Sequence, residues 1–451
     1  MTQQTQLARL GLFDAKVPRY TSYPTAPQFS TSVQASHYKR WLAEVPEGGQ
    51  VSLYIHVPFC KRLCWFCACR TQGVNNNDPV NSYLATLKDE IGMVADILPR
   101  GVKLSRLHWG GGTPTIMEAD QIESLARAIT DALPFAEGAE FSVEVDPNEL
   151  DDSRLDALAA AGMNRASIGV QDFDPKIQKT IGREQGFEIT RDVADKLRAR
   201  GIHSLNTDIL FGLPHQDIAS ITDTTNKLIS LSPDRVALYG YAHVPWMSKR
   251  QTMIPEQHLP GSRDRLSLYD VARDLFLAAG YRAIGIDHFA KPGDGLDMAA
   301  SNGTLRRNFQ GYTDDTCMTL IGLGASAISR FPQGYVQNIS ATSPYLAQIR
   351  QGNLASARGH AFTAEDLLRS RVIEEIMCNF AFDLAAVEAE FDSVAVNLRP
   401  EMRLVQAKYA PFTRLDGTTL RILPEGQPLT RMVAREFDAY AMDASGHSMA
   451  I

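Results

Sequence analysis

Short runs rich in β-branched and aromatic residues alternate with amphipathic helical segments over much of the chain, and no other feature limits the fold as strongly. This alternation is typical of βα units, whose strands lie parallel in one sheet. Asp78 and Pro79 mark the start of one helix, while Gly162, Gly201 and Gly280 each mark a helix end. The predicted strands are 51–57, 104–109, 140–145, 165–170, 204–210 and 235–241, with 281–286 as a further candidate.

Parallel strands joined by right-handed crossovers form either a barrel or a doubly wound sheet, and the pattern alone allows both α/β folds. In either fold, the residues that bind ligands gather at the carboxyl ends of the strands. Several residues suited to chemistry stand at or just after a predicted strand end: Cys60, 110–113, Glu144, Gln171, Asp208 and Ala242.

The two ends of the chain depart from this pattern. Residues 1–50 contain four prolines and are predicted to form a loop-like arm. From about residue 360 the pattern is mainly helical, with helices predicted over 363–382 and 429–442 and a short strand near Leu420. We therefore expect an arm (1–50), a catalytic α/β unit with its following loops (51–359) and a small, mainly helical domain (360–451).

The composition is that of a folded globular protein. Hydrophobic residues make up 44% of the chain and charged residues 22%, both near the usual values. The net charge is −7 and no run of five like charges occurs, so we expect neither a nucleic-acid partner nor a membrane-surface helix. No segment resembles a signal peptide or offers the about 18 apolar residues of a membrane span, which favours a cytoplasmic location.

Four of the six cysteines lie within ten residues, a spacing that indicates a metal site rather than a disulfide scaffold. Cys60, Cys64 and Cys67 have CxxxCxxC spacing, which suits an iron–sulfur cluster with one iron open to a small molecule. A structural zinc site is the alternative, but its second ligand pair usually lies a dozen or more residues away. Cys69 could be a fourth ligand, a reactive thiol or a packing residue.

Six further motifs are specific enough to indicate a family. They are PRYTSYPT from Pro18, YIHVPFC from Tyr54, HWGGGTPT from His108, EVDP from Glu144, GVQDF from Gly169 and RNFQGYT from Arg307. Together with the cysteine loop, they resemble the oxygen-independent coproporphyrinogen III oxidase (dehydrogenase) family of the radical S-adenosylmethionine superfamily. The resemblance covers nearly the whole chain and implies a partial, TIM-like (β/α)6-type barrel.

The resemblance also implies an activity. Enzymes of this family convert two propionates of coproporphyrinogen III to vinyls and so form protoporphyrinogen IX on the anaerobic route to haem. A 5'-deoxyadenosyl radical, made from S-adenosylmethionine on a 4Fe-4S cluster, removes a hydrogen atom from the propionate β-carbon. Loss of carbon dioxide and one electron then leaves the vinyl group. The implied partner is an electron donor such as a flavodoxin or ferredoxin, and a monomer is expected.

Site residues follow from the same resemblance, position by position. The cluster ligands would be Cys60, Cys64 and Cys67. The S-adenosylmethionine on the cluster would contact Tyr54, Gly111, Glu144, Ala242 and Ile328. A second S-adenosylmethionine would contact Phe66, Gly112, Thr113, Gln171, Arg183 and Asp208. No side chain is assigned as catalytic, because the radical derives from the cofactor; Tyr54 and Glu144 are the closest candidates.

The residue types suit these roles, although each alone is a weak signal. The glycine triplet 110–112 would let a backbone edge approach a ligand, but such triplets are commonly turns. A strand-end carboxylate often caps a helix, and an aromatic side chain often only packs. The four carboxylates of the substrate call for cationic partners, which we expect in the arm and the late loops at Arg19, Lys291, Arg306 and Arg307.

Two other functions stay open. Haem chaperones of the same superfamily retain the cysteine motif, but they usually have phenylalanine at the position of Cys69 and lack the tyrosine-rich arm and the RNFQGYT motif. This chain has the arm and that motif. A radical methyltransferase that uses two S-adenosylmethionines is the third possibility, and it would leave a methyl group on its product.

Overall fold

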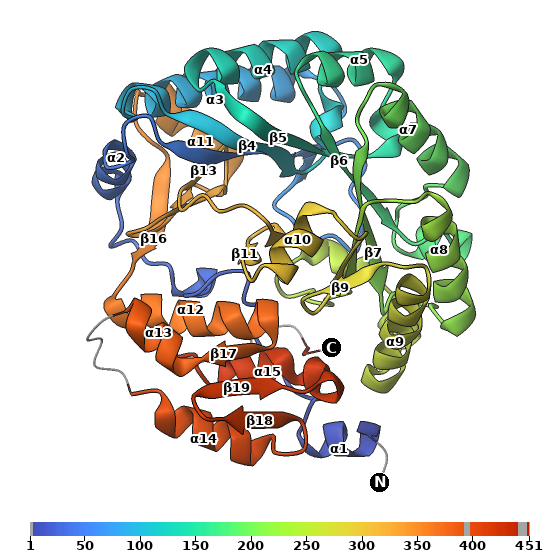
Figure 1. Ribbon diagram of the computed structural model, residues 1–451. Helices are drawn as coiled ribbons and strands as arrows, with labels where there is room; N and C mark the ends of the chain where they lie inside the picture. Colours follow the sequence, from blue (N-terminus) through green and yellow to red (C-terminus); the bar gives the residue numbers. More distant parts are fainter. Residues whose placement is uncertain (1–2, 392–396, 441–448, 451) are drawn as a thin grey trace.

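A computed structural model describes residues 3–391, 397–440 and 449–450, in which six parallel strands form the centre of a curved sheet (Figure 1). These strands are β1 (Gln50–Val57), β4 (Lys103–Gly111), β5 (Phe135–Val145), β6 (Arg165–Gln171), β7 (Ser204–Phe211) and β8 (Arg235–Gly240). The helices of the outer layer are α3 (Asp78–Ile97), α4 (Ala119–Ala132), α5 (Asp152–Ala160), α7 (Phe187–Ala199), α8 (Ile218–Ser230) and α9 (Ser262–Ala278). The predicted α/β fold with a partial parallel barrel is confirmed.

The parallel strands are extended at both edges. The sheet order is β16-β15-β14-β13-β1-β4-β5-β6-β7-β8-β10-β9, and β9 and β16 are its edge strands within the described residues. The candidate strand at 281–286 is β9, but the antiparallel β10 lies between it and β8. The added strands are β9 (Arg282–Ile284), β10 (His288–Ala290), β13 (Leu320–Leu323), β14 (Ile328–Phe331), β15 (Gly334–Asn338) and β16 (Ser356–Ala361).

The helix boundaries follow the sequence signals. Helix α3 begins at Asp78 with Pro79 in its first turn, where the missing N–H costs nothing. The glycines just after α5, α7 and α9 have φ of +90° (Gly162), +82° (Gly201) and +88° (Gly280), which favours glycine because it has no Cβ. These three helices therefore end where the glycines predicted.

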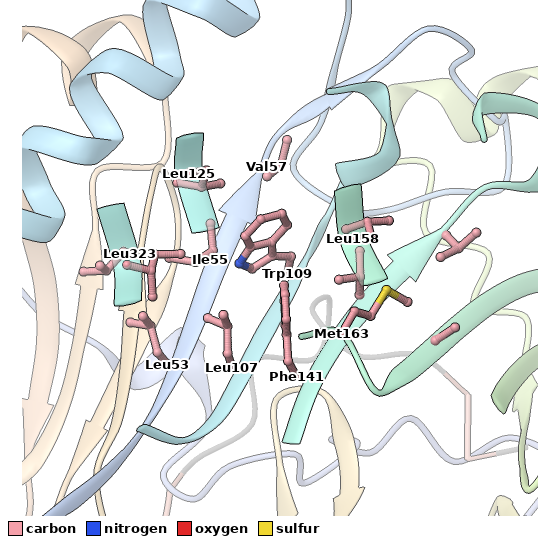
Figure 2. Packing of buried hydrophobic residues seen from close by; sticks show 14 of the residues in the cluster. Leu53, Ile55, Val57, Leu107, Trp109, Leu125, Phe141, Leu158, Met163 and Leu323 are labelled. Atoms are coloured by element: carbon pink, nitrogen blue, oxygen red, sulfur yellow. The ribbon is translucent and has the colours of Figure 1, made fainter. Parts of the chain in front are cut away.

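The main core lies between the sheet and the outer helices. Alternate residues of β1, such as Ile55, point into it, and on the neighbouring strands the rings of Trp109 and Phe141 pack edge to face with centroids 5.0 Å apart (Figure 2). Leu125 of α4 and Leu158 of α5 cover these rings from the helical layer. The opposite face of the central strands is thereby left for polar residues.

The amino-terminal segment is less loop-like than predicted. It contains helix α1 (Gln3–Arg9) and helix α2 (Ala35–Ala43). In α2, Tyr38, Trp41 and Leu42 recur at helical spacing and are buried in the main core. The prediction missed these helices because the prolines around them dominate the local composition.

The carboxyl-terminal segment combines helices with a small sheet. Its elements are α12 (Ala364–Asn379), β17 (Ala381–Asp383), α13 (Leu384–Glu390), α14 (Arg399–Lys408), β18 (Thr413–Asp416), β19 (Thr419–Ile422) and α15 (Thr430–Arg435). The predicted strand near Leu420 is β19. The helix predicted over 429–442 ends at Arg435, whose guanidinium donates to the carbonyls of Asp438 and Tyr440 as the chain turns back; residues 441 and 442 lie outside the described residues.

Shorter elements complete the chain between these units. They are β2 (Phe59–Cys60), β3 (Gln72–Gly73), α6 (Pro175–Thr180), α10 (Gly295–Ser301), β11 (Arg306–Asn308), β12 (Gly311–Thr313) and α11 (Thr342–Arg350). Among the described residues, no helix has the length and apolar character needed to cross a membrane.

One buried carboxylate connects α3 to the loop that follows β13. The side chain of Glu90 accepts hydrogen bonds from Gly324 N (2.7 Å), Asn338 Nδ2 (2.7 Å) and Tyr345 Oη (2.6 Å). Burial raises the pKa of Glu90 to about 7, although these three donors oppose the shift. The loop that leads to Ile328 is therefore held by a group that releases its proton near neutral pH.

The Glu90→Gln variant should remove a pH dependence of stability. Because burial raises the pKa of Glu90 from 4.5 to about 7, its contribution is fully present below pH 4.5 and is lost as the pH rises to about 7. Relative to the variant, wild-type protein should lose on the order of 3 kcal/mol of unfolding free energy over this range. Urea unfolding at several pH values measures the difference, and the exposed Glu123→Gln is the control. Parallel pH profiles for wild type and Glu90→Gln would contradict the prediction.

Candidate active site

A cavity of about 1220 Å³ extends along the inner face of the parallel strands, from their amino ends at Arg165 and Arg235 to the residues beyond their carboxyl ends. Its wall combines segments that are far apart in the sequence, including Arg19 of the arm, Cys67 of the cysteine loop, Arg307 of β11 and Arg431 of α15. Segment β11 lies within the arc of the sheet (Figure 1). The cavity is larger than the roughly 300–1,000 Å³ of ordinary small-molecule sites, so it has room for a large ligand beside a cofactor.

The cysteine loop is held at both ends and at each thiol. Strand β2, which ends at Cys60, pairs with β3 after the loop. Thr113 Oγ1 lies 3.5 Å from Cys60 Sγ, Arg183 Nη1 lies 3.6 Å from Cys64 Sγ, and the backbone N–H of Cys69 lies 3.4 Å from Cys67 Sγ. Each of the three predicted ligands thus has a hydrogen-bond donor, which favours the thiolate that binds iron.

The donor set fits a cluster better than a single ion. Among the described residues, no three His, Cys, Asp or Glu side chains are close enough together to hold one metal ion. Thiolates that bind different irons of a cluster stand further apart than the ligands of one zinc ion, so separated thiols agree with the cluster interpretation. None of the six cysteines, all of which are described, forms a disulfide.

Cys69 interacts most strongly with Cys67, and its backbone N–H lies 3.4 Å from Cys67 Sγ. A hydrogen bond from the Cys69 thiol is the main cause that lowers the pKa of Cys67 to about 6, with the Cys69 backbone N–H and Arg250 acting in the same direction. Burial raises the pKa of Cys60 to about 11. The geometry therefore makes Cys69 a donor to a neighbouring thiolate.

The five residues predicted for the S-adenosylmethionine on the cluster all line the cavity: Tyr54, Gly111, Glu144, Ala242 and Ile328. The ring of Tyr54 stacks on His108 with centroids 5.8 Å apart. Glu144 accepts a hydrogen bond from Gly111 N (3.0 Å) and lies 3.4 Å from His108 Nε2. The structure thus brings a flat aromatic wall and an exposed carboxylate together beside Cys67; their roles in cofactor binding stay predictions.

The residues predicted for the second cofactor divide into two groups. Phe66 and Asp208 line the cavity, and burial raises the pKa of Asp208 to about 6. The other four, which do not line it, lie near the cysteine loop or at the carboxyl end of β6: Gly112, Thr113, Gln171 and Arg183. The nearby Asn206 donates to Asp208 (3.0 Å), which keeps the carboxylate directed along the strand.

The glycine triplet has a packing role that the sequence interpretation missed. A Cβ on Gly110 would lie 2.5 Å from Glu144 Oε1, and one on Gly112 would lie 2.5 Å from Phe59 O. Gly111 has φ of +107°, and a Cβ there would lie 2.3 Å from His56 Cε1. The positions that were expected to stay open for a ligand are therefore filled by the protein itself, and only Gly111 of the three lines the cavity.

Comparisons with known proteins agree with this geometry. The Radical SAM superfamily model matches residues 54–228. The chain is 60% identical to an oxygen-independent coproporphyrinogen III oxidase of Paracoccus denitrificans over the full length of both chains, and 36% identical to one of Escherichia coli, covering 96% of this chain and 95% of that one. This chain belongs to the oxygen-independent coproporphyrinogen III oxidase family. The solved structure of coproporphyrinogen III oxidase from Escherichia coli, a radical SAM enzyme, superposes with a TM-score of 0.89 at 35% identity, covering 95% of this chain and all of that one.

Membership in this family makes the chain a radical S-adenosylmethionine enzyme, and the superfamily implies a 4Fe-4S cluster and S-adenosylmethionine. Cys60, Cys64 and Cys67 are the residues that would hold the cluster. Of the three, Cys67 lines the cavity together with Glu144 and Tyr54, whereas Cys60 and Cys64 do not line it.

Two of the four predicted cationic partners of the substrate reach the cavity. Arg19 and Arg307 line it. Lys291 binds Ser232 O (2.8 Å) and Arg306 binds Glu374 (2.7 Å), and neither lines the cavity, so these two predictions are wrong. Along β11 successive side chains alternate between faces, which separates the adjacent Arg306 and Arg307.

Sequence reasoning missed most of the cavity's arginines. They come from the cysteine loop, β4, β6, β8, α9 and α15: Arg70, Arg106, Arg165, Arg235, Arg265, Arg273 and Arg431. Burial, with the charge of Arg19 acting in the same direction, lowers the pKa of Arg265 to about 10 and that of Arg431 to about 9. No local sequence motif predicts that these residues line the cavity, because they come together only when the chain folds.

The Cys64→Ala variant should lose most of its iron, whereas Cys69→Ala should keep it. The reason is that Cys64 is one of the three spaced thiols, while Cys69 only donates to Cys67. Iron and sulfide content and the visible absorption band after anaerobic reconstitution provide the measurement. Loss of the cluster in Cys69→Ala would instead show that Cys69 is a required ligand.

Proposed function

We propose that this chain catalyses the oxidative decarboxylation of two propionates of coproporphyrinogen III to vinyls, giving protoporphyrinogen IX for haem biosynthesis. The observation that carries the proposal is a single cavity whose wall joins the cysteine loop to several arginines. A substrate with four carboxylates would pair some of them with the arginines, while a reacting propionate would lie near the cysteine loop. Family membership supports the same substrate, since the relatives are named for it.

Arg307 is the arginine best placed to receive a carboxylate. Its side chain is only 4% exposed, and among the described residues its Nε and Nη1 have no hydrogen-bond partner. Its guanidinium lies 4.4 Å from the centroid of the Tyr312 ring, and Nη2 is 3.8 Å from Asp287 Oδ2. Buried donors without acceptors are costly, so a ligand carboxylate there would stabilise the site.

Arg19 extends the same positive region from the arm. Its Nη2 donates to Gly240 O at 2.9 Å, at the carboxyl end of β8, while the rest of the side chain projects into the cavity. Burial would raise the pKa of Asp287, but Arg307, His288 and Arg19 together lower it. The ionised carboxylate of Asp287 therefore faces two guanidinium groups, those of Arg307 and Arg19. The excess positive charge is available to an anionic ligand.

The chain's own residues position the reactants and exclude water. Tyr54 and His108 form a stacked wall, and Glu144 offers an acceptor for an ammonium or hydroxyl group near Gly111. When bound, the cluster and S-adenosylmethionine supply a 5'-deoxyadenosyl radical that removes a hydrogen atom from the propionate β-carbon. The arm and α15 close the far end of the cavity and limit the access of water.

We also propose that two S-adenosylmethionines bind. Support comes from Phe66 and Asp208, which belong to the second predicted set and yet line the same cavity as the first set. Catalytic candidates remain Tyr54 and Glu144.

Further parts of the proposal concern the cellular setting. An electron donor such as a flavodoxin or ferredoxin would supply the electrons, and the chain would act as a monomer. Six cysteines without a disulfide suit a reducing compartment, which favours the cytoplasm. The arm (1–50), the catalytic barrel with its following loops (51–359) and the carboxyl-terminal domain (360–451) are proposed as the functional parts.

An anaerobic assay tests the activity directly. Reconstituted protein, reductant, S-adenosylmethionine and coproporphyrinogen III should yield protoporphyrinogen IX with the loss of two carbon dioxides and the formation of two 5'-deoxyadenosines for each product. Cys64→Ala should yield neither product, because the cluster would be lost. Mass spectrometry of the tetrapyrroles and chromatography of the nucleoside provide the readouts. Tight haem binding with unchanged substrate would favour the chaperone function, and a methylated product would favour a methyltransferase.

The Arg307→Ala variant should raise the KM for coproporphyrinogen III by about 10- to 100-fold, because it removes a charge-assisted hydrogen bond worth about 1.5–3 kcal/mol. The neighbouring Arg306→Ala is the matched control, since Arg306 binds Glu374 outside the cavity wall and should leave KM nearly unchanged. Steady-state kinetics with the substrate varied measures both. Equal effects of the two substitutions would contradict a role for Arg307 in substrate binding.

A further inference from the structure

The loop after β8 carries an unusual group of exposed apolar side chains. Trp246 is 55% exposed, Met247 is 68% exposed and Met253 is 58% exposed. These three are among nine exposed large hydrophobic residues in the described chain, yet they fall within eight consecutive positions. Scattered apolar residues are ordinary on a surface, but a local concentration indicates a binding surface.

The same loop is bonded to the backbone of the cysteine loop. Ser248 Oγ donates to Cys67 O (2.9 Å), and Gln251 Nε2 donates to Phe66 O (2.7 Å). Arg250 Nη2 donates to Cys69 O (3.2 Å). The loop that carries the exposed apolar side chains is thus joined by three direct hydrogen bonds to the backbone of the cysteine loop.

The charge around these side chains is positive. Residues 244–255 contain Lys249 and Arg250 but no aspartate or glutamate, in a chain whose net charge is −7. Lys16 of the arm adds a further cation, with its Nζ 5.8 Å from the centroid of the Trp246 ring. The nearest following carboxylate, Glu256, binds His243 at 2.9 Å. We call the exposed side chains of Lys16, Trp246, Met247, Lys249 and Met253 the donor face.

We propose that the donor face is the docking surface for an acidic one-electron carrier protein. The inference rests on the proposed function, which requires reduction of the cluster. Tryptophan and methionine with basic neighbours match the composition of protein interfaces, and the positive charge would steer a negative partner. In the docked complex one electron passes from the reduced carrier to the oxidised cluster; the carrier is oxidised, the cluster is reduced, and no covalent bond forms or breaks.

Reduced flavodoxin, an acidic flavin carrier, is the probe, and the double variant Met247→Glu with Lys249→Glu is the test. Calorimetric titration of the cluster-loaded protein should show that this variant raises the Kd for flavodoxin by at least about 10-fold, because it replaces one apolar side chain by a carboxylate and reverses one positive charge. Raising the salt concentration should weaken binding of the wild type more than binding of the variant. Lys103→Glu at the amino end of β4, on the face opposite the cysteine loop, should bind as the wild type does.

A second measurement separates docking from chemistry. With dithionite, a small reductant that needs no docking surface, the double variant should form product at the wild-type rate within about twofold. Unchanged flavodoxin affinity in the double variant, or an equal loss in Lys103→Glu, would overturn the proposal. The proposal would also be overturned if the double variant bound flavodoxin as the wild type does but lost self-association or binding to anionic vesicles. If wild-type protein failed to convert coproporphyrinogen III with dithionite, the proposed function would fail, whereas the titration would still report on docking.

Discussion

Two backbone hydrogen bonds hold the cysteine loop against the sheet, and the rest of the site depends on them. Gly112 N donates to Val57 O and Thr113 N donates to Phe59 O, each at 2.8 Å, so the segment after β4 runs along the segment that leads to Cys60. Both bonds require a close approach of the two backbones, which only glycine permits at position 112. The register of β1 and β4 therefore sets the position of Cys60, the first of the three predicted cluster ligands.

The other end of the cavity is organised by charge rather than by backbone pairing. Its guanidinium groups come from elements of both chain ends as well as the barrel, and several of them lower one another's pKa. Like charges gathered in a partly enclosed space oppose folding, so the barrel core and the packed helices must offset their repulsion. Part of the charge is balanced by carboxylates, since Arg106 and Arg165 both pair with Glu140 (3.0 and 2.8 Å) and Arg235 pairs with Asp294 (2.6 Å).

The sequence predicted the features that depend on local periodicity and on spacing. The six parallel strands, the helix ends at glycine and the cysteine loop are encoded within short segments. Helix α2 was missed because nearby prolines obscured the spacing of Tyr38, Trp41 and Leu42, and β10 was missed because it has only three residues. Lys291 and Arg431 show the general limit: whether a cation faces the cavity depends on contacts far away in sequence, which no local pattern reports.

Arg431 shows how the two chain ends complete a site that the barrel leaves open. Its Nε donates to Pro18 O (3.0 Å) and its Nη1 to Ala450 O (3.1 Å), and Nη2 donates to Val17 O. One guanidinium thus joins the arm, helix α15 and the carboxyl-terminal residues at the cavity wall, immediately before Arg19. Because the arm is fixed there, Arg19 can project over the strand ends, and the cysteine loop and the cavity's arginines become parts of one partly enclosed space.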